Sequence, residues 1–242
     1  MIVTIHQPSY LPWIPFVEKG LRSDVYVMLD DVQFEKNSEQ NRNRIKTSQG
    51  ELWLTVPVSR SLHTSILEVQ ISPTPKGWNV KHRQSIEQNY RKAPFFQQAA
   101  DILFPILESP GNNLVDLNLI VDKTFLEMAG FEGRIVRSSE MKIDGTGSER
   151  ILNICRELGA DTYLSGIAGY DYLDLAAFEK AQIKVLFQRY QHGEYPQRFP
   201  KVGFLPRLSA LDLFLNLGTE SANSHILAHS QWLTAADLDK EE

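Results

Sequence analysis

The residues best suited to ligand chemistry lie in the segment IHQPSYLPWIPF, at positions 5–16. His6 and Gln7 follow a short apolar strand pattern, and prolines stiffen the chain after them by fixing φ. His6 has the residue type of a general base, because the ordinary imidazole pKa is about 6.5. Tyr10 and Trp13 can stack on a base or a sugar. Ligands of open α/β sheets bind where strands end, so we expect a ligand pocket here. The alternative is a rigid structural turn.

Two acidic residues, Asp30 and Asp31, lie in the next apolar segment, 25–34. Carboxylates at a strand end can hold a divalent cation, orient a sugar hydroxyl or act as a general base. They can equally be solvated or cap a turn, and in an extended chain only one of the two points to a given side. We expect Asp30 to be catalytic by orienting His6 or a hydroxyl, and Asp31 and Gln33 to contact the ligand.

The segment QNRNRIK carries alternating cations, Arg42, Arg44 and Lys46, with Asn43 between them. In an extended chain the three cations share one face. Such a stripe suits phosphate or carboxylate recognition, although edge strands also carry basic residues to deter aggregation. We expect an anion site. The central hypothesis is that this segment and the N-terminal loop meet at one cavity that accepts an anionic small molecule.

Three further residues are candidates for ligand contacts. His82 has helical four-residue spacing to Ile86 and Tyr90, so it lies either on a lid over the site or in an amphipathic packed face. Ser165 and Gly166 end an apolar segment, and their small size lets a ligand approach the backbone. No nucleotide-binding or metal-binding motif occurs, so we expect no metal site, and the sequence names no cofactor.

Composition limits the class of partner. The chain has 242 residues, a net charge of −5 and a pI near 5.7, which disfavours nucleic acid except a charged tRNA as aminoacyl donor. Its one cysteine, Cys155, excludes an internal disulfide and fits a reducing compartment. The N-terminus lacks a signal-peptide pattern, and no apolar segment is long enough to span a membrane. We expect a cytoplasmic protein with a small-molecule substrate. The oligomeric state stays open.

The elements that must position these residues are those of an α/β fold with a mostly parallel sheet flanked by helices. Thr146 and Glu149 have capping-box spacing at one helix start. We expect one domain over residues 1–218 with a helical insertion at about 76–130, and a C-terminal extension over 219–242. Strands are expected at 2–6, from 25 to the pair Asp30 and Asp31, 52–58, 67–72, 133–139, 162–166 and 183–190, and helices at 13–24, 78–91, 94–108, 112–129, between Gly147 and Gly159, 176–182 and 208–218.

Several long motifs resemble the WbqC-like protein family: IHQPSYLPWIPF, YVMLDDVQFEKNSEQNRNRIKT, WLTVPV, YLSG and FLPRLSALDLFLNLG. The resemblance runs to about Gly218. Genes of this family stand among those for bacterial O-antigen and other surface polysaccharides. The resemblance therefore implies a transferase that acts on a nucleotide-linked amino sugar, for example by acyl or aminoacyl transfer. The alternative is a non-catalytic protein of the same pathway that binds a nucleotide-sugar or a partner.

A second resemblance concerns the fold. HQPSYLPW is similar to the P-x-H-x-G-H loop of cytidylyltransferase-like enzymes, with Pro8 at the proline position. Tyr10 and Trp13 stand where those enzymes have histidines, and Pro12 stands at the glycine. Neither Tyr10 nor Trp13 can carry a positive charge. The resemblance implies a nucleotidylyltransferase-like (HUP-like) fold, without nucleotidyl transfer by that mechanism.

Overall fold

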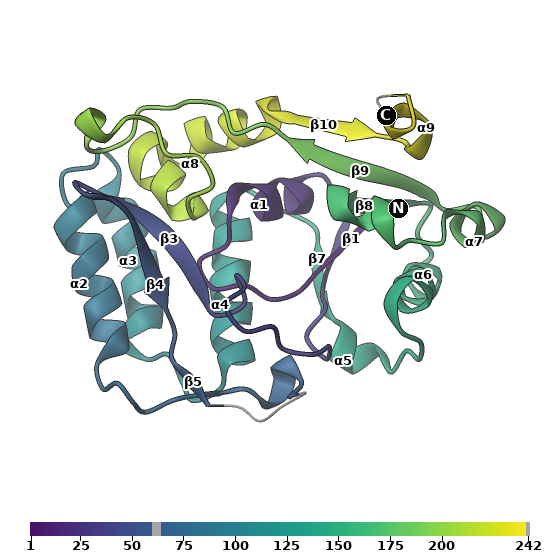
Figure 1. Ribbon diagram of the computed structural model, residues 1–242, viewed down its shortest axis with the longest axis horizontal. Helices are drawn as coiled ribbons and strands as arrows, with labels where there is room; N and C mark the ends of the chain where they lie inside the picture. The colour runs from purple at the N-terminus through teal and green to yellow at the C-terminus, as the bar shows by residue number, and fades with distance from the viewer. Residues whose placement is uncertain (60–63, 241–242) are drawn as a thin grey trace.

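A computed structural model describes residues 1–59 and 64–240 as an α/β fold built on one central sheet (Figure 1). The strand order is β10-β9-β8-β1-β2-β7, and every pair is parallel except β10 with β9. The mostly parallel sheet predicted from the sequence is confirmed. The strands are β1 (Ile2–His6), β2 (Val25–Met28), β7 (Arg134–Arg137), β8 (Thr162–Gly166), β9 (Lys184–Tyr190) and β10 (Ser230–Leu233).

The strand order reverses direction beside β1. From β1 the chain adds β2 and then β7 on one side, and it later adds β8 and β9 on the other side. A parallel sheet of this kind opens a crevice at the carboxyl ends of the two strands that flank the reversal. Here these strands are β1, which ends at His6, and β8, which ends at Gly166.

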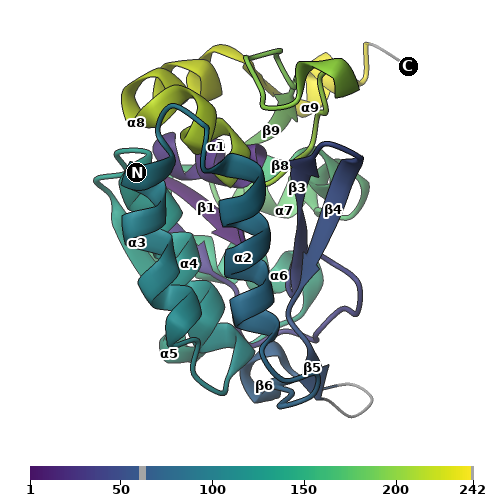
Figure 2. The same cartoon turned by 90° about the vertical axis from the view of Figure 1, so that its left-hand side faces the viewer.

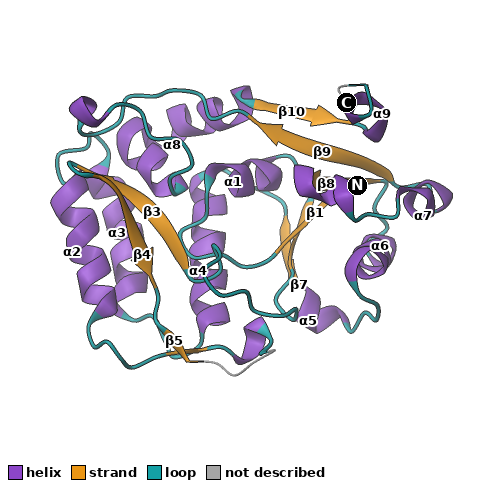
Figure 3. Ribbon diagram, in the orientation of Figure 1, coloured by secondary structure: helices purple, strands orange, loops and turns teal. Residues whose placement is uncertain are grey.

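Helices cover both faces of the sheet (Figures 1 and 3). Alternate residues of β2 separate the two cores: Tyr26 and Met28 pack in one cluster, and Val25 and Val27 in the other. Burial on both faces explains why these strands read as continuous apolar runs. The helices are α1 (Ile14–Leu21), α2 (Trp78–Tyr90), α3 (Phe96–Glu108), α4 (Leu114–Met128), α5 (Ser138–Met141), α6 (Gly147–Glu157), α7 (Leu175–Lys180), α8 (Ala210–Ala228) and α9 (Ala235–Leu238).

The expected helical insertion corresponds to α2, α3 and α4, which pack beside an antiparallel hairpin of β3 (Arg42–Thr47) and β4 (Gly50–Thr55) (Figure 2). A smaller pair, β5 (Val58–Ser59) and β6 (Gln70–Ile71), and short 3₁₀ helices at Ile66–Glu68, Ile167–Asp171 and Pro200–Val202 complete the fold. The prediction of one strand over 52–58 is therefore wrong, as is that of a strand over the whole of 67–72.

The second strand, predicted to end at Asp30 and Asp31, ends at Met28. After Met28 the backbone leaves the sheet, because Leu29 still donates to the His6 carbonyl whereas the Asp30 amide donates to the Ser138 hydroxyl. Thr146 occupies the N-cap of α6 but makes no side-chain cap hydrogen bond, so the predicted capping box is also wrong.

Most of the segment expected as a C-terminal extension packs with the rest of the fold. Helix α8 continues through a kink at Gly218, and β10 pairs with β9 in the central sheet. Residues 241–242 of that segment lie outside the described residues. Across residues 1–59 and 64–240, no helix combines the length and apolar character needed to cross a membrane.

Candidate functional site

A cavity of about 480 Å³ opens at the carboxyl ends of β1 and β8, where the strand order reverses. The end of each of these strands contributes, through His6 and Gly166, and α1 closes one side. Apolar walls alternate with a few polar groups, as in many ligand pockets. The lining residues are His6, Trp13, Pro15, Lys19, Gly166, Ile167, Ala168, Gln188, Tyr190, His192 and Arg207.

Helix α1 presents one of its faces to this cavity. Trp13 is its N-cap residue, and a proline fits the first turn because that backbone nitrogen needs no hydrogen-bond partner. Pro15 and Lys19 are one turn apart, so they lie on the same face, and both line the cavity. Phe16 and Val17 point into the core instead. The loop that follows β1 therefore ends in a helix that carries a cation to the cavity.

Lys19 is the least expected member of the site. Its side chain is only 5% exposed, yet its ammonium group has no hydrogen bond or ion pair with any residue that the structure describes. Burial lowers the pKa of Lys19 to about 8, while the neighbouring Glu18 opposes that shift. A buried ammonium group without a counter-ion is costly. The cavity therefore offers an unpaired positive charge to a ligand.

His6 presents a lone pair to the same cavity. Its Nδ1 lies 2.8 Å from the carbonyl oxygen of Gln7, which can only accept, so Nδ1 carries the ring proton and Nε2 is an acceptor. Burial, followed by the nearby Lys19 charge, lowers the pKa of His6 to about 3. His6 is therefore neutral at pH 7. The value near 6.5 that made it a suitable general base does not apply here.

The exposed end of the cavity is also cationic. Arg207 is exposed and lines the opening beside His192. Burial, and then the charges of Arg207 and Arg44, lower the pKa of His192 to about 4. No aspartate or glutamate occurs among the lining residues. The cavity thus has the electrostatic character of an anion site.

Of the residues predicted from the sequence, His6, Trp13 and Gly166 line the cavity. Ser165 is buried behind it and donates to the carbonyl of Gly166. Gln7 accepts a hydrogen bond from the side chain of Gln40, 2.7 Å away, on the other side of the loop.

Tyr10 and His82 lie together in the core. Tyr10 is fully buried, and its hydroxyl lies 2.8 Å from Nδ1 of His82. Trp78 packs against both rings. Burial lowers the pKa of His82 to about 4. This geometry favours the packed interpretation of His82 over the lid.

The cations of β3 share a face, as expected, but each of them already interacts with other groups of the protein. The guanidinium groups of Arg42 and Arg44 lie 4.4 and 5.1 Å from the ring centre of Trp53. Arg42 also donates to a backbone carbonyl. Arg44 pairs with Glu51 and donates to the carbonyl of Arg207. Arg44 therefore reaches the cavity only indirectly, by supporting Arg207.

Lys46 is buried, and its ammonium donates to Gln197 and to the carbonyl of Gly203. Asn43 donates to the carbonyl of Leu11, 2.7 Å away. The N-terminal loop and the QNRNRIK segment therefore do lie against each other, as expected. The contact is structural, since none of the four predicted residues of that segment lines the cavity.

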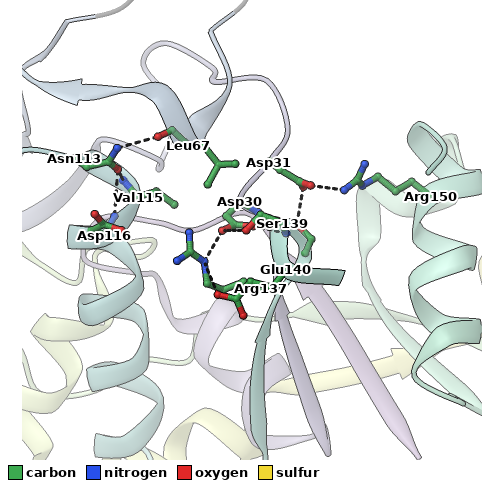
Figure 4. Close-up of polar contacts among 11 residues, drawn as sticks. Asp30, Asp31, Leu67, Asn113, Val115, Asp116, Arg137, Ser139, Glu140 and Arg150 are labelled. Carbon is green, nitrogen blue, oxygen red and sulfur yellow. Dashed lines mark hydrogen bonds and ion pairs between the residues drawn. The ribbon is translucent and has the colours of Figure 1, made fainter. Parts of the chain in front are cut away.

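Asp30 and Asp31 belong to a separate polar cluster at the ends of β2 and β7 (Figure 4). Asp30 is fully buried and accepts from Arg137 at 2.7 Å and from the amide and hydroxyl of Ser139, both at 2.9 Å. Asp31 pairs with Arg150. None of these hydrogen bonds reaches His6. The arrangement is that of carboxylates tying β2 to α5 and α6.

Gln33 is exposed and forms an isolated backbone bridge with Ser65, away from the cavity lining. Within residues 1–59 and 64–240, no group of three or more His, Cys, Asp or Glu side chains has the geometry of a metal site.

Replacing Asp30 with alanine is expected to lower the free energy of unfolding by about 3 kcal/mol, because it leaves Arg137 and Ser139 without their buried partner. Because Asp30 lies outside the cavity lining, its replacement should leave the affinity of the folded fraction for pyrophosphate equal to that of the unmodified protein, whatever that affinity is. Urea unfolding and calorimetric titration measure the two effects. Asp31→Ala is the matched control and should cost less, because Asp31 is partly exposed. Lost binding with unchanged stability would instead place Asp30 in the site, as the sequence predicted.

Sequence reasoning missed Lys19, Gln188 and Arg207. Lys19 follows Glu18, so the two charged residues look like the solvent-exposed part of a short helix. The four-residue spacing between Lys19 and Pro15 was a signal that both side chains lie on the same helix face. Gln188 stands in the apolar segment 183–190, where a buried amide requires partners, and this was the second signal. Arg207 lies in a loop, where no sequence pattern indicates which way a side chain points.

The fold and the cavity define a class: an α/β protein with a cationic pocket where the order of its parallel strands reverses. The chain belongs to the WbqC-like protein family, whose profile matches residues 7–224. It is 35% identical over 223 residues to the uncharacterized protein Rv1507c of Mycobacterium tuberculosis (strain ATCC 25618 / H37Rv), covering 90% of this chain and 95% of that protein. No solved structure matches it significantly. The family predicted from the sequence motifs is confirmed.

Proposed function

We propose that this protein is a cytoplasmic transferase that acts on a nucleotide-linked amino sugar in the biosynthesis of bacterial surface polysaccharide, by acyl or aminoacyl transfer. The observation that carries the proposal is Lys19, a residue only 5% exposed, whose ammonium group has no hydrogen-bond or ion-pair partner among the described residues and lies in a cavity lined by no carboxylate. An anionic ligand supplies the charge that this group lacks. The volume of about 480 Å³ is in the range of small-molecule sites, roughly 300–1,000 Å³.

Four of the lining residues have a role in this proposal. Lys19 and Arg207 bind the phosphates. Trp13, with its ring 6.2 Å from that of His192, packs on the apolar face of the ligand. Nε2 of His6 accepts a hydrogen bond from the amine or hydroxyl that receives the transferred group. A neutral histidine can still accept that proton as the amine is acylated, because the amine becomes much more acidic in the course of the reaction.

A binding protein without chemistry is the second candidate. The observation in its favour is the low pKa of His6, about 3, together with the absence of a carboxylate beside it in the cavity lining. Such a protein holds the same ligand and presents it to an enzyme of the pathway.

Calorimetry with a panel of UDP-, GDP- and dTDP-sugars, followed by mass analysis of the mixtures, tests these proposals. A sugar nucleotide that binds and changes mass in the presence of an acyl donor supports the transferase. A ligand that binds and keeps its mass under all donors supports the binding protein. If no sugar nucleotide binds, both proposals are wrong.

Transfer of an aminoacyl group can take a charged tRNA as donor. A gel-shift assay over a salt series tests this partner, because binding carried by phosphate contacts weakens steeply as salt rises. With a net charge of −5, we expect contact to be confined to a local basic surface such as that of Arg42 and Arg44 on β3.

A further inference from the structure

The inner end of the cavity presents hydrogen-bond acceptors, whereas a site for an anion alone presents donors and positive charges. We infer that Gln188 and His6 form an acceptor subsite that binds the hydroxyl or N–H groups of the sugar, while Lys19 and Arg207 hold the phosphates. The inference rests on the proposed function and adds to it the direction in which the ligand lies. The sugar is inside and the nucleotide is at the opening.

The orientation of the Gln188 side chain is fixed by its neighbours. Its Nε2 lies 2.9 Å from the carbonyl oxygen of Pro15 and 2.6 Å from a carboxylate oxygen of Glu18. Both of these groups only accept, so the amide nitrogen must face them, and it uses both of its protons there. The amide oxygen has no hydrogen-bond partner among the described residues, and the side chain lines the cavity. Gln188 therefore presents an acceptor to the ligand.

Glu18 is itself held in place by distant parts of the chain. It is fully buried and accepts a hydrogen bond from Arg22, the C-cap residue of α1. It also accepts from Ser230 and Trp232 of β10. A carboxylate with several donors around it has little freedom to move. Strand β10 thus contributes to the cavity indirectly: it holds the Glu18 carboxylate in place, and this carboxylate orients the Gln188 side chain.

His6 adds the second acceptor. Its Nδ1 proton is engaged with the carbonyl of Gln7, so the Nε2 lone pair is available to the ligand. Lys19 and His6 line the same cavity. Two fixed acceptors beside a cation exclude a positively charged amine. They fit hydroxyl, amide N–H or neutral amine groups attached to an anion, as in a sugar phosphate.

Burial gives the direction of the ligand. Gln188 and Lys19 are 6% and 5% exposed, whereas Ile167 is 46% exposed and Arg207 is also exposed. Gln188 and Lys19 therefore both lie at the closed end, where the sugar and the phosphate attached to it bind, and Arg207 lies at the opening, where it reaches the phosphate next to the nucleoside. Because a buried acceptor without a partner is costly, a sugar that donates to Gln188 gains affinity over a ligand without one.

Titration with UDP and with UDP-N-acetylglucosamine tests the inference. UDP lacks the sugar and carries about one more negative charge on its free terminal phosphate, which works against the preference expected for the sugar nucleotide. The unmodified protein should bind UDP-N-acetylglucosamine about tenfold more tightly than UDP. Gln188→Met keeps the size of the side chain and removes the acceptor. We expect this variant to lose most of the tenfold difference, with the affinity for UDP changed by less than about twofold.

Gln191→Met, an exposed position just after β9, is the matched control and should leave both affinities unchanged. Equal binding of the two ligands by the unmodified protein overturns the inference, even if Gln188→Met fails to fold. So does a Gln188→Met variant that weakens both ligands equally or neither. If neither ligand nor pyrophosphate binds, the proposed function fails as well, whereas binding of UDP alone leaves the anion site intact.

Discussion

Replacing Lys19 with methionine is expected to weaken the binding of pyrophosphate and of UDP by about a hundredfold or more. The ammonium group is buried in the cavity and has no partner among the described residues, so a bound anion is its counter-ion. Methionine keeps the length and apolar volume of the stem. Isothermal titration at constant ionic strength measures the loss.

The same substitution should raise the stability of the free protein. An unpaired buried charge disfavours folding, and methionine removes that charge without leaving a void. Lys19→Met should therefore unfold at a higher urea concentration than the unmodified protein at pH 7. Opposite effects on binding and on stability distinguish a ligand-binding lysine from one that supports the fold. Unchanged binding would remove Lys19 from the site.

The pH dependence of both effects follows from the pKa of Lys19, which is lowered from 10.5 to about 8. Below pH 8 the amine is charged in the folded and the unfolded protein, so its destabilising effect is fully present. Between these two values the unfolded chain holds the extra proton, so stability rises with pH through this window. The stability advantage of Lys19→Met should shrink over the same range.

Affinity for UDP should be nearly constant from pH 7 to 8 and fall by up to about tenfold per pH unit above that, as free Lys19 loses its charge. His6 and His192 face the same cavity, but their pKa values of about 3 and 4 keep them neutral throughout this range. Lys123→Met is the matched control, because this exposed lysine of α4 lies outside the cavity lining.

The main strands of the sheet were predictable because burial on both faces leaves continuous apolar runs. Residues 2–6 and 162–166 form strands over the predicted ranges. The end of the second strand was not predictable, since it depends on a contact between Asp30 and Ser138, which are far apart in the sequence. The register of β10 on β9 is equally non-local, so nothing in the segment 219–242 revealed it.

The candidate site was predictable in position but only partly in its side chains. Tyr10 and Trp13 stand in the same proline-rich loop, yet Tyr10 points into the core and Trp13 lines the cavity. Between them Leu11 has φ of 51°, a left-handed conformation that redirects the chain. For the basic stripe the decisive partner is Trp53 of β4, which only the folded hairpin brings over Arg42 and Arg44.

Replacing Glu18 with alanine is expected to lower the free energy of unfolding by about 3–5 kcal/mol. The loss removes the buried acceptor of four donors: Gln188, which is itself buried, the partly buried Ser230 and Trp232, and the exposed Arg22. Since folded proteins are stable by only about 5–15 kcal/mol, this is a large part of the total. Urea unfolding measures it. Glu127→Ala, which removes an exposed ion pair with Lys123, is the matched control and should change stability by less than about 1 kcal/mol.

Which part of the molecule is destabilised by Glu18→Ala is a stricter test of the role of Glu18 than the total loss of stability. Because Glu18 ties β10 to the Gln188 side chain, its removal should loosen both together. Hydrogen exchange of the β10 amides, Ser230–Leu233, should speed up more than that of β1. In the fraction that stays folded, the preference for UDP-N-acetylglucosamine over UDP should fall, because the freed Gln188 amide can turn its nitrogen toward the ligand. The contrary result is a Glu18→Ala variant that loses stability while its β10 amides exchange no faster and its preference for UDP-N-acetylglucosamine is unchanged. It would show that the carboxylate stabilises the core and does not position Gln188.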